Sequence, residues 1–356
     1  MVQLTKSGYL DYLKCDKALW LKLRDPDVVA WPVPTEFERM LMADGYAVEA
    51  VVKTHVHSWD DGDKYSFQEV FETEDGLYAR ADMVCTYPDG SIDIWEIKAS
   101  TRLNPPGADH VNDAAFQTLV AERSGKTVNK IGVVHVNGDY VLERALDPAG
   151  FLSFADVTND ARARIAEITA TVGEALALIG EDDIDRAGCN CTGKSKGQHC
   201  AAFSYFNPDI PNPSIYDIPR LSAANRTTFV EAGTFGLDEI DAGALSAIQS
   251  TVVRAAQSDA PIINHAAVAA FLDQLSYPLY FYDYETFGSA IPVAPGTKPH
   301  EQIPVQVSLH IVQQGTPTEH AECLTEQPGA HREIVDFLIR HIGPEGNIVS
   351  WNAPFE

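Results

Sequence analysis

Three charged side chains lie in two neighbouring predicted strands: Asp82 in LYARADMVCTY, and Glu96 and Lys98 in SIDIWEIKA. The Pro-Asp-Gly turn at 88–90 between these apolar runs is typical of a β-hairpin. Because side chains alternate across a strand, Glu96 and Lys98 share a face, and the hairpin can bring Asp82 beside them. Two carboxylates can hold Mg²⁺ or Mn²⁺ for phosphodiester hydrolysis, and a lysine can orient the water or neutralise the developing charge. The alternative is a salt bridge between Glu96 and Lys98, with Asp82 at a bulge.

A second group of residues suits a different metal. It consists of Cys15 in YLKCDKALWL and of Cys189, Cys191 and Cys200 in GCNCTGKSKGQHC. Four thiolates fit tetrahedral Zn²⁺ or an iron–sulfur cluster, and the C-x-C pair followed by C-x₈-C is not the spacing of a standard zinc ribbon. One thiol precedes the predicted hairpin and three follow it, so a shared metal would staple the two ends of this region. The alternative is buried free thiols. Cys85 and Cys323 are expected to be isolated structural cysteines.

A third acidic group lies near the C-terminal end of the sequence. Asp283 and Glu285 are two residues apart in the aromatic strand YFYDYETFG, so they point the same way and can share a divalent ion. The segment SWNAPFE follows a later predicted strand and ends in Glu356. The alternative is an ordinary acidic turn.

The strand aspartate followed by Glu-x-Lys on the next strand resembles the core of PD-(D/E)XK nucleases. Glu49 in GYAVEAVV and Gln117 in DAAFQTLVAERSG extend the resemblance to the RecB-like branch, which has a further metal ligand and a glutamine at these places. The resemblance implies a restriction-endonuclease-like α/β (α+β) fold and Mg²⁺- or Mn²⁺-dependent hydrolysis of DNA, with an exonuclease expected. It also implies that Glu49, Asp82 and Glu96 bind the metal and that Gln117 orients the site or the strand.

The cysteine arrangement is similar to that of the iron–sulfur nucleases of the RecB-like group, including the AddB subunit and the CRISPR-associated exonucleases. In those proteins one N-terminal cysteine joins three C-terminal ones around a [4Fe–4S] cluster. The resemblance implies such a cluster on Cys15, Cys189, Cys191 and Cys200, with Zn²⁺ as the alternative. The C-x-C pair departs from the usual spacing, which weakens the match at Cys189 and Cys191.

The C-terminal segments resemble the first two motifs of DnaQ-like (DEDD) 3′–5′ exonucleases, which have an RNase H-like fold. Glu356 stands where that family has an aspartate, and its third motif would lie beyond residue 356. We therefore expect a partial, truncated RNase H-like domain here. The whole arrangement resembles a poorly characterised bacterial family that joins a RecB-like nuclease to a DnaQ-like domain.

The elements that must position these residues can be predicted from periodicity and turn residues. Helices are predicted at 5–24, 34–57, 110–124, 155–180 and 330–342, with further helical segments in 221–275, and strands at 66–73, 77–87, 91–99, 129–138, 277–287, 304–313 and 347–351. The predicted domains are a nuclease domain with the cysteine cluster (1–206), a linker and helical segment (207–275), and the truncated exonuclease domain (276–356).

Composition limits the choice of partners. The sequence has 26 Lys and Arg against 51 Asp and Glu, a net charge of −25, which argues against a broad electrostatic grip on nucleic acid. Local basic groups and bridging metal ions would have to supply the contact with DNA. No apolar run is long enough for a membrane span and no secretory signal is recognised, so a cytoplasmic location is expected.

Overall fold

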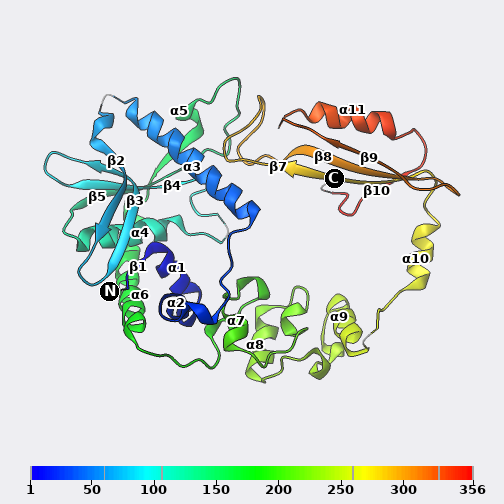
Figure 1. Ribbon diagram of the computed structural model, residues 1–356, viewed down its shortest axis with the longest axis horizontal. Helices are drawn as coiled ribbons and strands as arrows, with labels where there is room; N and C mark the ends of the chain where they lie inside the picture. The colour runs from blue at the N-terminus through cyan, green and yellow to red at the C-terminus, as the bar shows by residue number, and fades with distance from the viewer. Residues whose placement is uncertain (1, 60, 106, 259, 328, 355–356) are drawn as a thin grey trace.

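The computed structural model describes residues 2–59, 61–105, 107–258, 260–327 and 329–354, and combines helices with two mixed β-sheets (Figure 1). The larger sheet lies in the N-terminal half and the smaller one near the C-terminal end. The fold is therefore of the mixed α and β class, as the sequence predicts.

The larger sheet has six strands in the order β1-β3-β4-β5-β6, with β2 paired to β3. Its strands are β1 (Leu4–Thr5), β2 (Tyr65–Glu72), β3 (Leu77–Thr86), β4 (Ile92–Lys98), β5 (Val128–Val136) and β6 (Leu152–Asp156). The β3–β4 and β2–β3 pairs are antiparallel, whereas β4–β5 and β1–β3 are parallel. The predicted hairpin at 77–99 is thus confirmed at the centre of this sheet.

Helices cover both faces of the larger sheet (Figure 1). On one face lies α3 (Glu36–His57), which a Thr35–Glu38 capping box begins and whose Val48, Val52 and Val56 are fully buried. On the other face lie α4 (His110–Arg123) and α6 (Thr158–Gly180), which share a core with α1 (Lys6–Lys14) and α2 (Asp16–Arg24). Asp82 on β3, and Glu96 and Lys98 on β4, therefore lie in a sheet that has helices on both faces.

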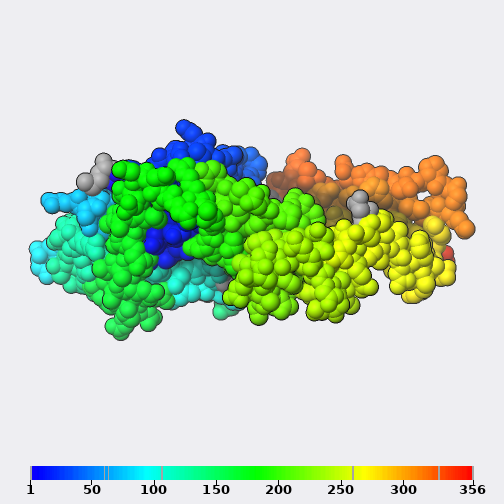
Figure 2. All heavy atoms as spheres, turned by 90° about the horizontal axis from the view of Figure 1, so that it is seen from below, coloured from blue at the N-terminus to red at the C-terminus, as the bar shows by residue number. Residues whose placement is uncertain are grey.

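Residues 181–275 connect the two sheets through short helices. They are α7 (Phe203–Phe206), α8 (Ala223–Glu231), α9 (Ala247–Ser258) and α10 (His265–Leu272), preceded by the cysteine-bearing loop. A small separate core of Ile215, Ile218, Leu237, Ile240 and Val253 holds the middle of this stretch together. Figure 2 shows it, in green and yellow, running along one face of the molecule towards the orange C-terminal sheet.

The smaller sheet has the strand order β10-β7-β8-β9. Its strands are β7 (Leu279–Phe287), β8 (Ile303–Val312), β9 (Glu319–Leu324) and β10 (Asn347–Val349). Helix α11 (His331–His341) packs on one face, where Ile334 and Phe337 meet Tyr280, Val307 and Leu309. The other face carries no helix in the described part of the chain (Figure 1).

The loop between β7 and β8 reaches back to the N-terminal half (Figure 1). Asp44 of α3 accepts hydrogen bonds from the hydroxyl of Ser289 and the backbone N–H of Ala290, both at 2.9 Å. The ring of His300 lies 2.8 Å from the carbonyl of Ala99, the residue after Lys98. The two halves of the chain are thus joined at this loop as well as through residues 181–275.

Two local predictions need correction, and one strand was missed. The single helix predicted at 5–24 is split into α1 and α2, because Cys15 has an extended backbone with φ −162° and ψ 108°. Residues 155–156 belong to β6, and α6 begins only at Thr158. Strand β9 was not predicted at all. Among the helices that the structure describes, none has both the length and the apolar character needed to cross a membrane.

Candidate metal-dependent active site and cysteine centre

The first candidate site lies where β3 and β4 separate. Their ladder runs from Thr86 opposite Ile92 to Met83 opposite Trp95. Beyond it, a carboxylate oxygen of Asp82 accepts the backbone N–H of Ile97 at 2.9 Å in place of a ladder bond. The side chains of β3 also stop alternating regularly here. Ala81 and Met83 are two residues apart and would share a face in a regular strand, but they belong to cores on opposite faces of the sheet. Asp82 therefore occupies an irregular position that turns its carboxylate towards β4.

Glu96 is the most deeply buried acidic group of this site, with a side chain only 1% exposed. One carboxylate oxygen accepts from the amines of Lys6 at 2.6 Å and Lys98 at 2.7 Å, and the other accepts from the amide of Gln117. Burial alone would raise the pKa of Glu96, but the two ammonium groups lower it to about 2. Glu96 is therefore held as a carboxylate in an apolar setting.

Lys98 is tied between two carboxylates. Its amine lies 2.7 Å from both Glu96 and Asp113 of α4, and its side chain is 21% exposed. Burial acts to lower the pKa of Lys98, yet the facing carboxylates raise it above its ordinary value. Lys98 is thus a fixed ammonium group, available to stabilise negative charge but not to act as a base.

Gln117 lies on α4 and is fully buried. Its amide nitrogen donates to Glu96, while its oxygen accepts no hydrogen bond from the described residues. A buried acceptor without a donor is costly and is the kind of group that a bound water or ion satisfies. The site therefore has an uncommitted oxygen beside the glutamate that the sequence singles out.

Glu49 lies on α3, which covers the face of the larger sheet opposite α4. It does not contact Asp82 directly, because the amide of Gln68 in β2 lies between them, donating to Glu49 at 2.8 Å and to Asp82 at 3.5 Å. In the described part of the chain, no three carboxylates or imidazoles are as compact as the cysteine group described below. The carboxylate oxygens of this site are of the type that Mg²⁺ or Mn²⁺ prefers. In this structure they are paired with lysine ammonium groups and glutamine amides.

A cavity of about 850 Å³ opens beside this site. It lies between α1, α4 and α6, and its lining includes Tyr9, Lys98, His110, Asp113 and Arg164. Lys98 is therefore accessible from this side to a molecule of moderate size.

The environment of Asp82 predicts an unusual pH dependence of stability. Burial, followed by repulsion from Glu96, raises the pKa of Asp82 from 3.8 to about 7. The folded state then binds a proton that the unfolded state lacks between about pH 4 and 7, so in metal-free protein this carboxylate costs stability as pH rises through that window. We expect Asp82→Asn to be more stable than the parent at pH 8, with the difference vanishing towards pH 4. Urea unfolding at both pH values checks this, and a difference independent of pH would contradict it.

Three residues of the site were missed in the sequence. Lys6 is 90 positions from Glu96, and nothing in its surroundings marks it. Asp113 lies one helical turn before Gln117 on the same side of α4, which could have indicated it. Gln68 is a polar residue between Phe67 and Glu69 in a strand, which by itself does not mark a site residue. Its role becomes visible only because α3 packs close by and brings Glu49 to its amide.

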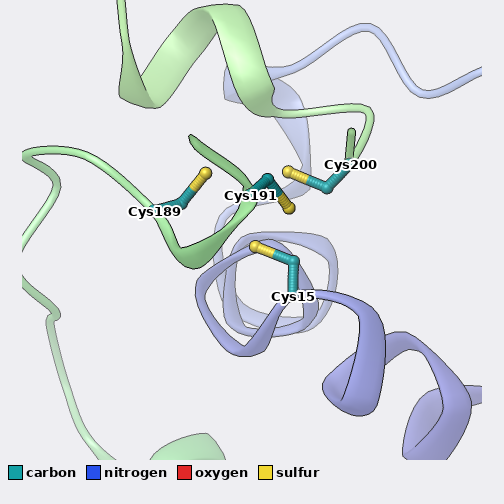
Figure 3. A group of neighbouring side chains, drawn as sticks. All are labelled: Cys15, Cys189, Cys191 and Cys200. Carbon is teal, nitrogen blue, oxygen red and sulfur yellow. The ribbon is translucent and has the colours of Figure 1, made fainter. Parts of the chain in front are cut away.

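The cysteine centre is the most compact group of potential ligands among the described residues. The sulfur atoms of Cys15, Cys189, Cys191 and Cys200 all lie within 4.8 Å of one another. Figure 3 shows Cys15 approaching from the junction of α1 and α2 and the other three from the later loop. The four side chains that the sequence predicts as partners are therefore brought together and can hold a metal ion.

The spacing of the sulfurs bears on the kind of metal. Bonds of about 2.3 Å to a single tetrahedral ion place thiolates roughly 3.8 Å apart, whereas a four-iron cluster holds them further apart. Thiol hydrogen bonds from Cys15 and Cys200 lower the pKa of Cys189, so a thiolate forms readily in this group. The sulfurs suit a single ion as they stand, and a cluster would require the cysteine loop to open slightly.

The cysteine centre also adjoins the first site through α1. Cys15 is the C-terminal cap of α1, and Lys6 is its first residue. Tyr9 of the same helix stacks on Phe116 of α4, with ring centroids 5.0 Å apart. A metal bound by the cysteines would hold in place the helix that carries Lys6.

The C-terminal candidates lie on a different surface. Asp283 and Glu285 are both exposed on β7 and alternate with Tyr282 and Tyr284, which pack towards α11. They therefore share the face of the sheet without a described helix. Glu356 lies outside the described residues.

A comparison with known protein families matches this last part of the chain. A family model described as a domain of unknown function, DUF2779, matches residues 280–356. No curated protein matches the chain. The C-terminal sheet with Asp283 and Glu285 is thus similar to a family whose description states no activity.

Proposed function

We propose that this protein is a metal-dependent nuclease of the PD-(D/E)XK type that hydrolyses phosphodiester bonds of DNA, with exonuclease action expected. The observation that carries the proposal is the meeting of Asp82, Glu96 and Lys98 where β3 and β4 separate. Buried charges of this kind are costly unless they are paired or bind a metal, and such strained clusters concentrate at functional sites.

The roles of the residues follow from their environments. Asp82 and Glu96, with Glu49 as a further ligand, would hold Mg²⁺ or Mn²⁺, which when bound lowers the pKa of a water molecule and polarises the phosphodiester. Lys98 keeps its positive charge beside them and stabilises negative charge that develops on the phosphate. Gln117 orients the carboxylate of Glu96 through its amide nitrogen.

The net charge of −25 restricts how DNA can bind. A chain this acidic repels the phosphate backbone at long range, so attraction must come from local groups. Lys6 and Lys98 concentrate two ammonium groups at Glu96, and a bound divalent cation would add to them. We therefore expect DNA affinity to depend strongly on divalent metal and on salt.

A degradation assay tests the proposal. The purified 356-residue chain, incubated with single- or double-stranded DNA, should release nucleotides in Mg²⁺ or Mn²⁺ and not in EDTA. Asp82→Asn should abolish the activity, whereas Asp93→Asn should retain it, because Asp93 is a buried carboxylate of the same strand as Glu96 whose partners are Tyr87 and the Lys130 backbone. Equal activity of the parent and Asp82→Asn would overturn the assignment.

A non-catalytic nucleic-acid or protein-binding module is the second candidate. Two observations favour it: Glu49, Asp82 and Glu96 do not form a compact trio, and the chain is strongly acidic. In that case metal would bind only at the cysteines, and the described salt bridges of Glu96 would be structural. Complete inactivity with every DNA substrate and both metals, together with unchanged stability on adding Mn²⁺, would favour this candidate.

For the cysteine centre we propose a structural [4Fe–4S] cluster, with Zn²⁺ as the alternative. The proposal rests on the resemblance of this arrangement, with one thiol at the α1–α2 junction and three in the later loop, to that of the iron–sulfur nucleases (Figure 3). The close spacing of the sulfurs favours the alternative. A brown protein absorbing near about 400 nm would identify the cluster, and a colourless protein with bound zinc would identify the single ion.

A further inference from the structure

Gln68 has a backbone conformation that is out of place in a strand. Its φ is 59°, in the left-handed region that non-glycine residues rarely adopt. The β2–β3 ladder continues on both sides, with Phe67 opposite Met83 and Glu69 opposite Ala81. The irregular residue therefore stands directly across from Asp82. A strained residue beside a candidate site is a reason to look for a role in that site.

The side chain of Gln68 joins carboxylates from two different elements. Its amide nitrogen donates to Glu49 of α3 at 2.8 Å and lies 3.5 Å from Asp82 of β3. A group that donates towards two carboxylates at once lies next to the place that a cation bound by both of them would take. An amide differs from other donors in one respect: turning it over replaces the nitrogen by an oxygen of nearly the same size.

We propose that Gln68 is an additional ligand of the divalent cation at this site. In the metal-free protein its nitrogen satisfies Glu49 and Asp82, and on metal binding the amide turns so that its oxygen faces the cation. Glutamine oxygens are accepted ligands of hard cations. The left-handed backbone keeps the amide within reach of both carboxylates. This inference rests on the proposed function. In it, the amide oxygen of Gln68 is a ligand in addition to the carboxylate oxygens of Glu49 and Asp82.

Direct binding of Mn²⁺ to the 356-residue chain, with its cysteine metal in place, tests the role without an activity assay. Free Mn²⁺ is followed by electron paramagnetic resonance for the parent, Gln68→Ala and Gln68→Glu. We expect Gln68→Ala to weaken Mn²⁺ binding roughly 10- to 100-fold, the usual effect of losing a group that supports a metal site. Gln68→Glu, which keeps an oxygen at this position, should bind at least as tightly as the parent.

Two further variants separate the amide from the backbone. Gln3→Ala is the matched control, since Gln3 contacts only exposed Glu72 at the edge of the sheet among the described contacts. Gln68→Gly should bind Mn²⁺ as weakly as Gln68→Ala yet unfold at a higher temperature, because glycine adopts a positive φ without strain. A purely structural role would instead make Mn²⁺ affinity follow thermal stability across these variants, which would overturn the proposal.

The remaining outcomes distinguish this inference from the proposed function. If Asp82→Asn loses Mn²⁺ binding while Gln68→Ala binds as well as or better than the parent, the ligand role of Gln68 is wrong and the nuclease site stands. If the parent chain binds no Mn²⁺ outside the cysteine centre, both are wrong.

Discussion

Replacing Lys98 by methionine should reduce DNA hydrolysis by roughly 100- to 1,000-fold at saturating Mg²⁺ and saturating DNA. Lys98 is a permanently charged group fixed by Glu96 and Asp113, so it can stabilise a transition-state charge without first being reorganised. Methionine keeps an apolar side chain of similar length and removes the ammonium group, with its charge and its contacts to Glu96 and Asp113. Initial rates of nucleotide release, measured over a range of DNA concentrations, check this.

Stability must be separated from catalysis in this variant. Removing the ammonium group leaves Glu96 and Asp113 with one partner fewer, which raises the pKa of Glu96 and destabilises the fold. Lys130→Met is the control, since Lys130 lies on neighbouring β5, 44% exposed, and pairs only loosely with Asp156 at 3.5 Å. Activity of Lys98→Met equal to that of Lys130→Met, at a temperature where both are folded, would show that Lys98 has no catalytic role.

Replacing Cys191 by serine should lower the free energy of unfolding by more than about 4 kcal/mol, because loss of a metal site is among the few single changes with so large an effect. Cys191 is fully buried, and its sulfur lies within 4.8 Å of those of the other three cysteines. A change of this size corresponds to a shift of roughly 10 °C in the midpoint of thermal unfolding. Metal analysis and thermal unfolding of the same preparation measure both consequences.

Cys323→Ser is the matched control for this prediction, since Cys323 is a half-buried free thiol on β9 in the smaller sheet. It should keep full metal content and nearly full stability. Cys191→Ser should also lose nuclease activity at temperatures where the larger sheet is still folded, because α1 then no longer places Lys6 on Glu96. Unchanged stability of metal-free Cys191→Ser would show that the four thiols do not hold the fold together.

The local structure around the first site could be predicted from the sequence. The alternating runs on either side of Pro88-Asp89-Gly90 are typical of a hairpin, and the period of two puts Glu96 and Lys98 on one face. The grouping of the four cysteines could also be predicted, since three lie in one short loop. These features depend on neighbours in the chain, where periodicity and turn residues are decisive.

Long-range packing decided the rest. Lys6 meets Glu96 because β1 pairs with β3 and α1 packs on α4, neither of which leaves a pattern near residue 6. The extended backbone at Cys15, which divides the predicted helix, lets its thiol face a loop about half the chain away. Gln68 separates Glu49 from Asp82 only because α3 lies across β2. A sequence pattern records which face a residue prefers, but the partner it meets there depends on how distant elements pack.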